Sequence, residues 1–161
     1  MVLARSRILA LIPSGLIEEF VMEGLGGAGY DLRLGRLYRL KSDGTLGVKE
    51  RTLPRVEEDK SDLFVLASGD YVLVETVEKV NMPGNLMARV LNRSTLFRMG
   101  CSLYNAVVDP GYKGTLTFGL KNLSDRKFTV ERGARIAQIV FEELDGEATL
   151  YDGKYQGGKV V

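Results

Sequence analysis

The sequence predicts a mainly β protein, an antiparallel sandwich or barrel preceded by one short N-terminal helix. Between residues 35 and 144, short alternating or apolar runs are separated by turn residues, a pattern typical of successive β-strands. Hairpin signals occur at residues 43–44 (DG), 68–70 (SGD) and 132–133 (RG). A chain of 161 residues is long enough for one domain with a core and short for two, so residues 1–161 are expected to form a single domain.

The N-terminal region is expected to be helical. The apolar spacing of residues 4–11 predicts a short helix, which Pro13 and Gly15 would end. One or two further helical turns are expected over residues 16–22. The β pattern begins after this region.

Five runs supply the expected strands and leave two segments outside them. Residues 49–62 (KERTLPRVEEDKSD) are highly charged and contain a proline, so we expect an exposed loop. Residues 152–161 are rich in glycine with few apolar anchors, and we expect a mobile C-terminal tail. The strand-forming runs are YRLKSDGTLGV, FVLASGDYVLVET, LMARVL, GTLTFGLKN and KFTVERGARIAQIVFEEL.

The amino-acid composition limits which classes of protein and which kinds of site the chain can form. Apolar residues make up 45% and charged residues 27%, and 22 Lys+Arg nearly balance 21 Asp+Glu, so the chain is not marked for disorder, membranes or nucleic acid. No apolar run approaches 18 residues and no leader cleavage site is evident, which favours a cytoplasmic protein. Cys101 is the only cysteine and histidine is absent, which excludes an internal disulfide, a multi-cysteine metal site and a histidine triad. Carboxylates, amides, hydroxyls and arginines must therefore perform any chemistry.

Two glycine-containing segments carry candidate polar groups early in the chain. In AGYDLRLG (28–35), Asp31 points away from its neighbours' face if the segment is extended, although an Asp capping a turn explains it equally well. In NRSTLFRMG (92–100), two arginines flank two hydroxyls, a combination that suits a polyphosphate or, more simply, a solvated surface. The residues of this second segment are Arg93, Ser94, Thr95 and Arg98.

Three later segments add further candidates. In AVVDPGYKGTLTFG, Asp109 opens a Pro-Gly turn, where an Asp is also common for local reasons. Gln138 enters a strongly apolar strand and needs a partner, structural or ligand. Lys154 and Tyr155 lie in the glycine-rich GKYQGG, which could fold over a ligand and exclude water.

Taken in order, AGYDL, RSTLFRMG, VDPGYKG and RGARIAQIVF resemble the superfamily of trimeric dUTP diphosphatases and dCTP deaminases. The resemblance covers residues 28 to 158, and the N-terminal part and GKYQ tail look more like the deaminase branch. It implies a distorted jelly-roll-like β-barrel, a homotrimer whose active sites are shared between subunits, and Mg²⁺ carried on the nucleotide triphosphate. The implied ligand is deoxyuridine triphosphate or a related pyrimidine deoxynucleotide.

The resemblance also implies roles for individual residues. Asp31 would support metal-bound water, and Asp109 would contact the sugar hydroxyl or orient the attacking water. The remaining implied contacts are Arg93, Ser94, Thr95 and Arg98 to phosphates or a neighbouring subunit, Gln138 to phosphates, Asn105 in the base-reading hairpin, Tyr112 against the deoxyribose, Lys154 towards the γ-phosphate and Tyr155 on the base.

Gly119 divides the two branches. In the deaminase branch, a glutamate on the strand after the DPG turn is the general base for water attack at C4 of cytosine, and that position falls on Gly119. General base catalysis contributes roughly 10²–10⁴-fold, and no acid follows Asp109 before Asp125. We therefore expect a dUTP diphosphatase, in which Asp109 orients water for attack on the α-phosphorus.

Three alternatives stay open. The first is a dCTP deaminase, or a bifunctional form, with its base elsewhere. The second is a catalytically silent nucleotide-binding trimer, and the third is a purely structural β module. Uracil and cytosine specificity is the least determined feature, because the base-reading segment CSLYNAVV is about two residues shorter than in many relatives.

Overall fold

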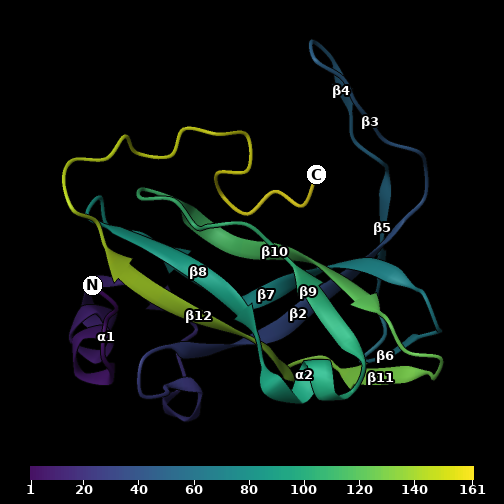
Figure 1. Ribbon diagram of the computed structural model, residues 1–161, viewed down its shortest axis with the longest axis horizontal. Helices are drawn as coiled ribbons and strands as arrows, with labels where there is room; N and C mark the ends of the chain where they lie inside the picture. Colours follow the sequence, from purple (N-terminus) through teal and green to yellow (C-terminus); the bar gives the residue numbers. More distant parts are fainter.

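An eight-stranded antiparallel sheet forms the body of the computed structural model, which describes residues 1–161 (Figure 1). Its main path runs β8-β12-β2-β7-β10-β9, while β1 pairs with β7 and β5 pairs with β2. The strands are β1 (Ile17–Glu18), β2 (Tyr30–Leu40), β5 (Val56–Asp59), β7 (Tyr71–Asn81), β8 (Leu86–Asn92), β9 (Cys101–Tyr104), β10 (Lys113–Asn122) and β12 (Arg135–Glu143).

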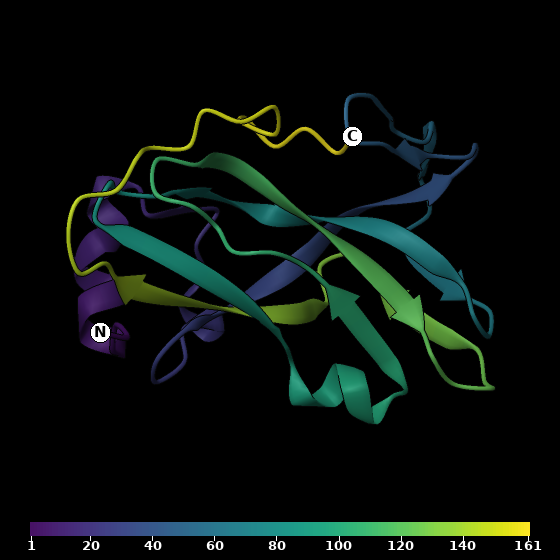
Figure 2. The same cartoon turned by 45° about the horizontal axis from the view of Figure 1, so that its top comes forward.

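The two outer strands of this path come back together, so that the sheet nearly closes into a barrel (Figure 2). Ala88 of β8 bridges Val108 through two backbone hydrogen bonds of 2.9 and 2.8 Å. The Asn92 carboxamide oxygen also accepts the backbone N–H of Leu103 in β9 at 2.7 Å. The expected antiparallel barrel with a mainly β composition is confirmed.

Two small sheets complete the β structure: β6 (Leu63–Leu66) pairs with β11 (Phe128–Glu131), and β3 (Thr45–Leu46) pairs with β4 (Arg51–Thr52). The β3–β4 ribbon projects from the body as an arm, at the upper right of Figure 1. Residues 49–62 are therefore not a simple loop, because they contain β4 and β5. The prediction of exposure holds for most of that segment.

The turn signals locate chain reversals but not strand partners. Turns do occur at 68–70 and 132–133, yet β6 and β11 pair with each other rather than with β7 and β12, which follow those turns. The predicted reversal at 43–44 is wrong, because the chain turns between β3 and β4, after residue 46. Turn residues encode local backbone geometry, whereas pairing depends on which apolar faces are buried together.

The first helix is confirmed as α1 (Arg5–Leu11), followed by a 3₁₀ turn, η1 (Ile12–Ser14), that ends at Gly15 with φ of 85°. The helical turns expected at residues 16–22 are wrong. That segment contributes β1, and only η2 (Met22–Gly24) is helical. Leu16 and Ile17 are buried, so burial along β7 overrides local propensity there. None of the helices has the length and apolarity that a membrane crossing demands.

A cluster of 32 buried apolar residues forms the core, and two buried carboxylates, Glu75 and Glu78, lie beside it. Glu75 of β7 is only 3% exposed. It accepts hydrogen bonds from the hydroxyls of Tyr38 at 2.8 Å and Thr115 at 2.7 Å, and from the guanidinium of Arg36 at 3.1 Å. Such saturation is what a buried charge requires, and it ties β2, β7 and β10 together.

Candidate functional site

A cavity of ≈ 530 Å³ lies along β10. Its lining is mostly apolar and aromatic, and Asp109 is the one acidic residue in it. Four regions supply the walls: β7, β10, the 106–109 segment before the Pro-Gly turn, and the base of the β3–β4 arm. The C-terminal segment adds Tyr151, Tyr155 and residues 159–161.

Asp109 stands on a turn that the fold holds firmly. The backbone N–H of Tyr112 donates to the Asp109 carbonyl at 3.2 Å, and Gly111 adopts φ of 79°, which a glycine reaches without strain. Two hydrogen bonds with the backbone of Met82, at 2.8 and 3.0 Å, fix this turn to the end of β7. The Asp109 side chain is exposed and has no ion-pair or hydrogen-bond partner in the chain. It is therefore a free carboxylate on a rigid support at the cavity wall.

Tyr112 is the buried aromatic of the same wall. Its hydroxyl donates to the carbonyl of Thr115, and its ring meets Tyr151 edge-on with centroids 5.5 Å apart. Burial, aided by the nearby Tyr151, raises the pKa of Tyr112 to about 12. Tyr112 thus offers a neutral, fixed ring surface beside Asp109.

The C-terminal segment is docked over this turn, as the yellow ribbon above β10 in Figure 1 shows. The Gln156 carboxamide accepts the Lys113 backbone N–H at 2.8 Å and donates to the Gly111 carbonyl at 3.1 Å. Tyr155 lies in the cavity wall, while the ammonium of Lys154 sits 5.0 Å from the Tyr155 ring centroid and outside that wall. The mobility expected for residues 152–161 concerns motion and stays a prediction.

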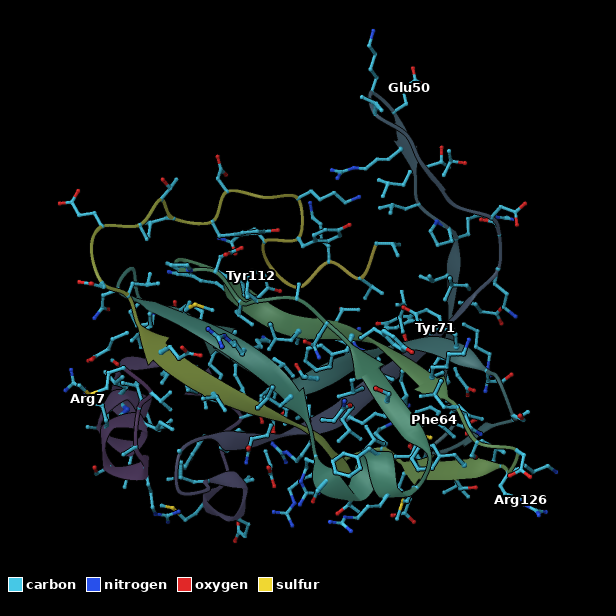
Figure 3. All side chains as sticks on the ribbon, in the orientation of Figure 1. Arg7, Glu50, Phe64, Tyr71, Tyr112 and Arg126 are labelled. Carbon is cyan, nitrogen blue, oxygen red and sulfur yellow. The ribbon has the colours of Figure 1, made fainter.

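Gly119 of β10 lies directly beneath the ring of Tyr71. A Cβ placed on Gly119 would come within 2.7 Å of two ring carbons of Tyr71, and closer still to its hydroxyl oxygen. Burial raises the pKa of Tyr71, and the neighbouring Tyr104, 6.2 Å away between centroids, raises it further. Figure 3 shows Tyr71 near the base of the arm and Tyr112 under the C-terminal segment. Only glycine fits at 119 while Tyr71 keeps this position.

A second polar cluster is built around Asp31 on β2. Its carboxylate pairs with the guanidinium groups of Arg93 at 3.0 Å and Arg135 at 3.4 Å, and its side chain is 14% exposed. Tyr30 and Leu32 on either side are fully buried, so Asp31 faces away from them as expected. Gln138 of β12 is the cross-strand neighbour of Asp31, and its carboxamide makes no hydrogen bond within the chain.

Next to this cluster lies α2 (Ser94–Arg98), a five-residue helix that the sequence analysis did not anticipate. The side chains of Ser94, Thr95 and Arg98 are exposed and make no hydrogen bond or ion pair within the chain. Arg98 only rests 5.8 Å from the centroid of the Phe97 ring. These hydroxyl and guanidinium donors are therefore available to an external anion.

The predicted site residues fall into two groups that one chain does not bring together. Asp109, Tyr112 and Tyr155 line the cavity, whereas the Asp31 cluster adjoins α2. In Figures 1 and 2, α2 lies at the edge of the molecule opposite the C-terminal segment. Asn105 is exposed just before the cavity wall begins at residue 106.

Sequence reasoning missed several wall residues. Tyr71 and Thr117 lie in strands that alternation identified, yet nothing in their spacing marked them as facing a cavity. Tyr151 precedes the GKYQGG segment and carried no signal. Arg135 was not singled out within its strand-forming run, and its pairing with Asp31 depends on the β2–β12 register.

The carboxylates do not build a cation cage of their own. No group of three or more acidic, cysteine or histidine side chains gathers anywhere in residues 1–161. Asp31 is already held by two guanidinium groups. This donor set fits a cation that arrives bound to the oxygens of a phosphorylated ligand, not one held by protein ligands alone. The role expected for Asp31 near such a cation stays a prediction.

Comparison with known proteins gives two activities side by side. The family model described as dCTP deaminase-like matches residues 2–144. The chain is 36% identical over 129 residues to the probable deoxyuridine 5'-triphosphate nucleotidohydrolase of Methanothermobacter thermautotrophicus, covering 80% of this chain and 85% of that protein. It is 38% identical over 143 residues to the dCTP deaminase of Pyrococcus furiosus, with coverage of 88% and 85%. The dUMP-forming dCTP deaminase of Aquifex aeolicus is 34% identical over 166 residues, covering 100% and 92%.

Solved structures agree on the fold. The dCTP deaminase of Agrobacterium tumefaciens superposes with a TM-score of 0.70 at 22% identity, over 87% of this chain and 47% of that chain. This chain thus spans about half the length of that deaminase chain. The dUTPase of Staphylococcus bacteriophage 80alpha, solved with dUpNHpp, gives a TM-score of 0.52 at 17% identity, over 90% and 88%.

Proposed function

Because the chain belongs to the dCTP deaminase-like family, we propose that it acts as a dUTP diphosphatase, converting dUTP and water to dUMP and diphosphate. Relatives named for dUTP hydrolysis and for dCTP deamination match it about equally well, so a feature of the chain itself must decide. That feature is Gly119. Its place in the cavity wall carries no carboxylate, and the ring of Tyr71 fills the adjacent space.

The remaining cavity groups support hydrolysis at phosphorus over attack on a base ring. Asp109 is the single carboxylate in the wall, and the other titratable groups that line it are tyrosines and Lys159. One carboxylate can orient and partly deprotonate a water molecule for attack on the α-phosphorus. The proton moves from that water to an Asp109 carboxylate oxygen, and diphosphate leaves. Tyr112 packs against the deoxyribose and leaves no room for a 2′-hydroxyl.

The phosphates are held by the second polar group in this proposal. Arg93, Ser94 and Arg98 provide hydrogen bonds to anionic oxygens, and Gln138 adds a free carboxamide. Since this group lies apart from Asp109 within one chain, we propose a homotrimer in which each active site combines the cavity of one subunit with the arginines of another. A Mg²⁺ ion bound to the triphosphate would neutralise part of its charge.

The direct test is a Mg²⁺-dependent incubation with dUTP and with dCTP in separate tubes, following diphosphate and ammonia in each. We expect diphosphate from dUTP and no ammonia from dCTP. Ammonia from dCTP would contradict the proposal, because a general base other than residue 119 would then be at work. Nucleotide binding without either product would indicate a silent nucleotide-binding protein.

One observation favours a second candidate, a deaminase that also releases diphosphate. The dUMP-forming dCTP deaminase of Aquifex aeolicus aligns over the entire chain, whereas the probable dUTP hydrolase of Methanothermobacter thermautotrophicus aligns over 80% of it. The two candidates differ in a single product, because only the deaminase releases ammonia. The two-tube measurement therefore separates them.

A further inference from the structure

The part of the cavity wall between β7 and β10 has a chemistry that the proposed hydrolysis does not use. Tyr71 and Leu73 come from β7, and residues 116–119 come from β10. The Tyr71 ring lies over Gly119, as the clash of any added Cβ demonstrates. Its hydroxyl forms no hydrogen bond with another group of the chain. A phenol hydroxyl is thus available in a mostly apolar wall.

Thr117 supplies a second, independent observation on the same wall. Its Oγ1 atom is buried from solvent and has no hydrogen-bond partner, the only such side-chain atom in residues 1–161. Thr117 and Gly119 lie two residues apart on β10, so they face the same side of the sheet, and both line the cavity. A buried hydroxyl without a partner costs about 1–3 kcal/mol, and turning the Thr117 side chain so that its hydroxyl meets a ligand atom in the cavity would recover that cost.

The wall suits a flat heteroaromatic ring. Tyrosine rings and aliphatic side chains cover the faces of such a ring, while two hydroxyls can each donate and accept at its polar edge. The pKa of Tyr71 is raised, chiefly by burial, so its hydroxyl keeps its proton well above neutral pH. Asp109 lines the same cavity, which places the reacting end of a nucleotide within the same enclosure.

We propose that the hydroxyls of Tyr71 and Thr117 form a specificity-determining pair that hydrogen-bonds the polar edge of the substrate's pyrimidine ring, with the Tyr71 ring filling the space above Gly119. This inference rests on the proposed nucleotide hydrolysis and adds the residues that read the base. Tyr71 then has two effects. It contributes a neutral hydrogen-bonding group, and it leaves no volume for a side chain at residue 119.

The hydrogen bonds proposed between these two residues and the base are tested with Tyr71→Phe and Thr117→Val. Each substitution removes one hydroxyl and keeps the shape of the side chain. Each variant should raise KM for dUTP by about tenfold while kcat changes less than threefold, because one ligand hydrogen bond is lost. Calorimetric binding of dUpNHpp should weaken by the same factor. Thr117→Val should also leave the ligand-free protein at least as stable as the native chain, since it removes an unsatisfied buried hydroxyl. Thr45→Val, at an exposed position of β3 outside the cavity wall, is the matched control.

The packing of the Tyr71 ring over Gly119 is tested with Gly119→Ala alone and combined with Tyr71→Ala. Gly119→Ala should lower the melting temperature, because its methyl group collides with the Tyr71 ring. In the Tyr71→Ala background, the same substitution should cost little. If Gly119→Ala lowers the melting temperature equally in both backgrounds, the inferred packing of the Tyr71 ring over Gly119 is wrong.

The outcomes separate the inference from the function on which it rests. A native chain that hydrolyses dUTP, with KM and dUpNHpp affinity unchanged in both hydroxyl variants, overturns the inference and leaves the hydrolysis standing. A native chain that neither hydrolyses dUTP nor binds dUpNHpp overturns the proposed function, and the inference with it.

Discussion

The cavity along β10 and the cluster around α2 differ in the kinds of side chain that form them. The cavity is walled by aromatic and aliphatic side chains and contains a single carboxylate, Asp109. The cluster is charged and partly exposed, with Asp31 balancing Arg93 and Arg135 and with Arg98 left free. A pyrimidine nucleotide has the same division, an aromatic ring at one end and phosphates at the other. Each region matches one end of that ligand, and neither matches both.

The difference also underlies the proposal that a complete site needs more than one chain. Asp109 is supported by a turn that is hydrogen-bonded to the end of β7, while Arg93 adjoins β12 and Asp31 of β2. The barrel keeps these supports apart. Variants that separate the contributions of the two regions are therefore the most informative.

The largest effect is expected in the cavity. Asp109→Asn keeps the size and polarity of the side chain and removes the group that takes a proton, so dUTP turnover should fall by about 10²–10⁴-fold. Binding of dUpNHpp and the melting temperature should stay close to native values, because Asp109 is exposed and makes no contact that stabilises the fold. Steady-state diphosphate release and calorimetry measure the two quantities.

Asp125→Asn is the control for this variant. Asp125 is an exposed aspartate whose side chain is 85% accessible and forms an ion pair only with Arg126. The Asp125→Asn variant should hydrolyse dUTP at the native rate. Native turnover in Asp109→Asn would remove Asp109 from the reaction and, with it, the assignment of the cavity as the reacting end.

A smaller effect is expected in the α2 cluster. Arg93→Met removes a guanidinium donor to phosphate, worth roughly 10–100-fold in KM, with a lesser change in kcat. Asp31 keeps Arg135 as a partner in this variant, so the fold should tolerate the change. Arg126→Met, at an exposed position with an 85% accessible side chain, is the matched control. An unchanged KM in Arg93→Met would contradict phosphate binding by this cluster.

Mixing the two variants tests whether the regions meet across subunits. If each site takes Asp109 from one subunit and Arg93 from another, refolding the variants together in equal amounts restores about a quarter of the sites to native composition. At dUTP concentrations well below the native KM, activity should then exceed that of either variant alone. If both residues come from the same chain, no mixture can contain a native site and activity will not recover.

The sequence predicted one region better than the other, for physical reasons. Alternation identified the strands that carry Gly119 and Thr117, and the opposite orientation of Asp31 relative to Tyr30 followed from the two-residue period. The turn signals did not reveal that β6 pairs with β11, because strand partners depend on long-range burial. The ring of Tyr71 above Gly119 depends on the β7–β10 register, which local sequence does not encode.

The smallest effect is expected on the free energy of unfolding at alkaline pH. It concerns the hydrogen-bonded group around Glu75, which ties β2 to β7 and β10. Burial and the hydrogen bond to Glu75 raise the pKa of Tyr38 from 10.0 to about 12 in the folded chain. Between pH 10 and 12 the unfolded chain therefore loses a proton that the folded chain keeps, and the free energy of unfolding should fall as pH rises. Tyr38→Phe should be less stable at pH 7, because Glu75 loses a donor, yet show a shallower decline above pH 10. The decline should not vanish, since the pKa of Tyr112 is also about 12. Urea unfolding at pH 7, 10 and 11.5 measures how the free energy of unfolding of each protein declines with pH. An equal decline in the two proteins would mean that Tyr38 does not keep its proton in the folded chain.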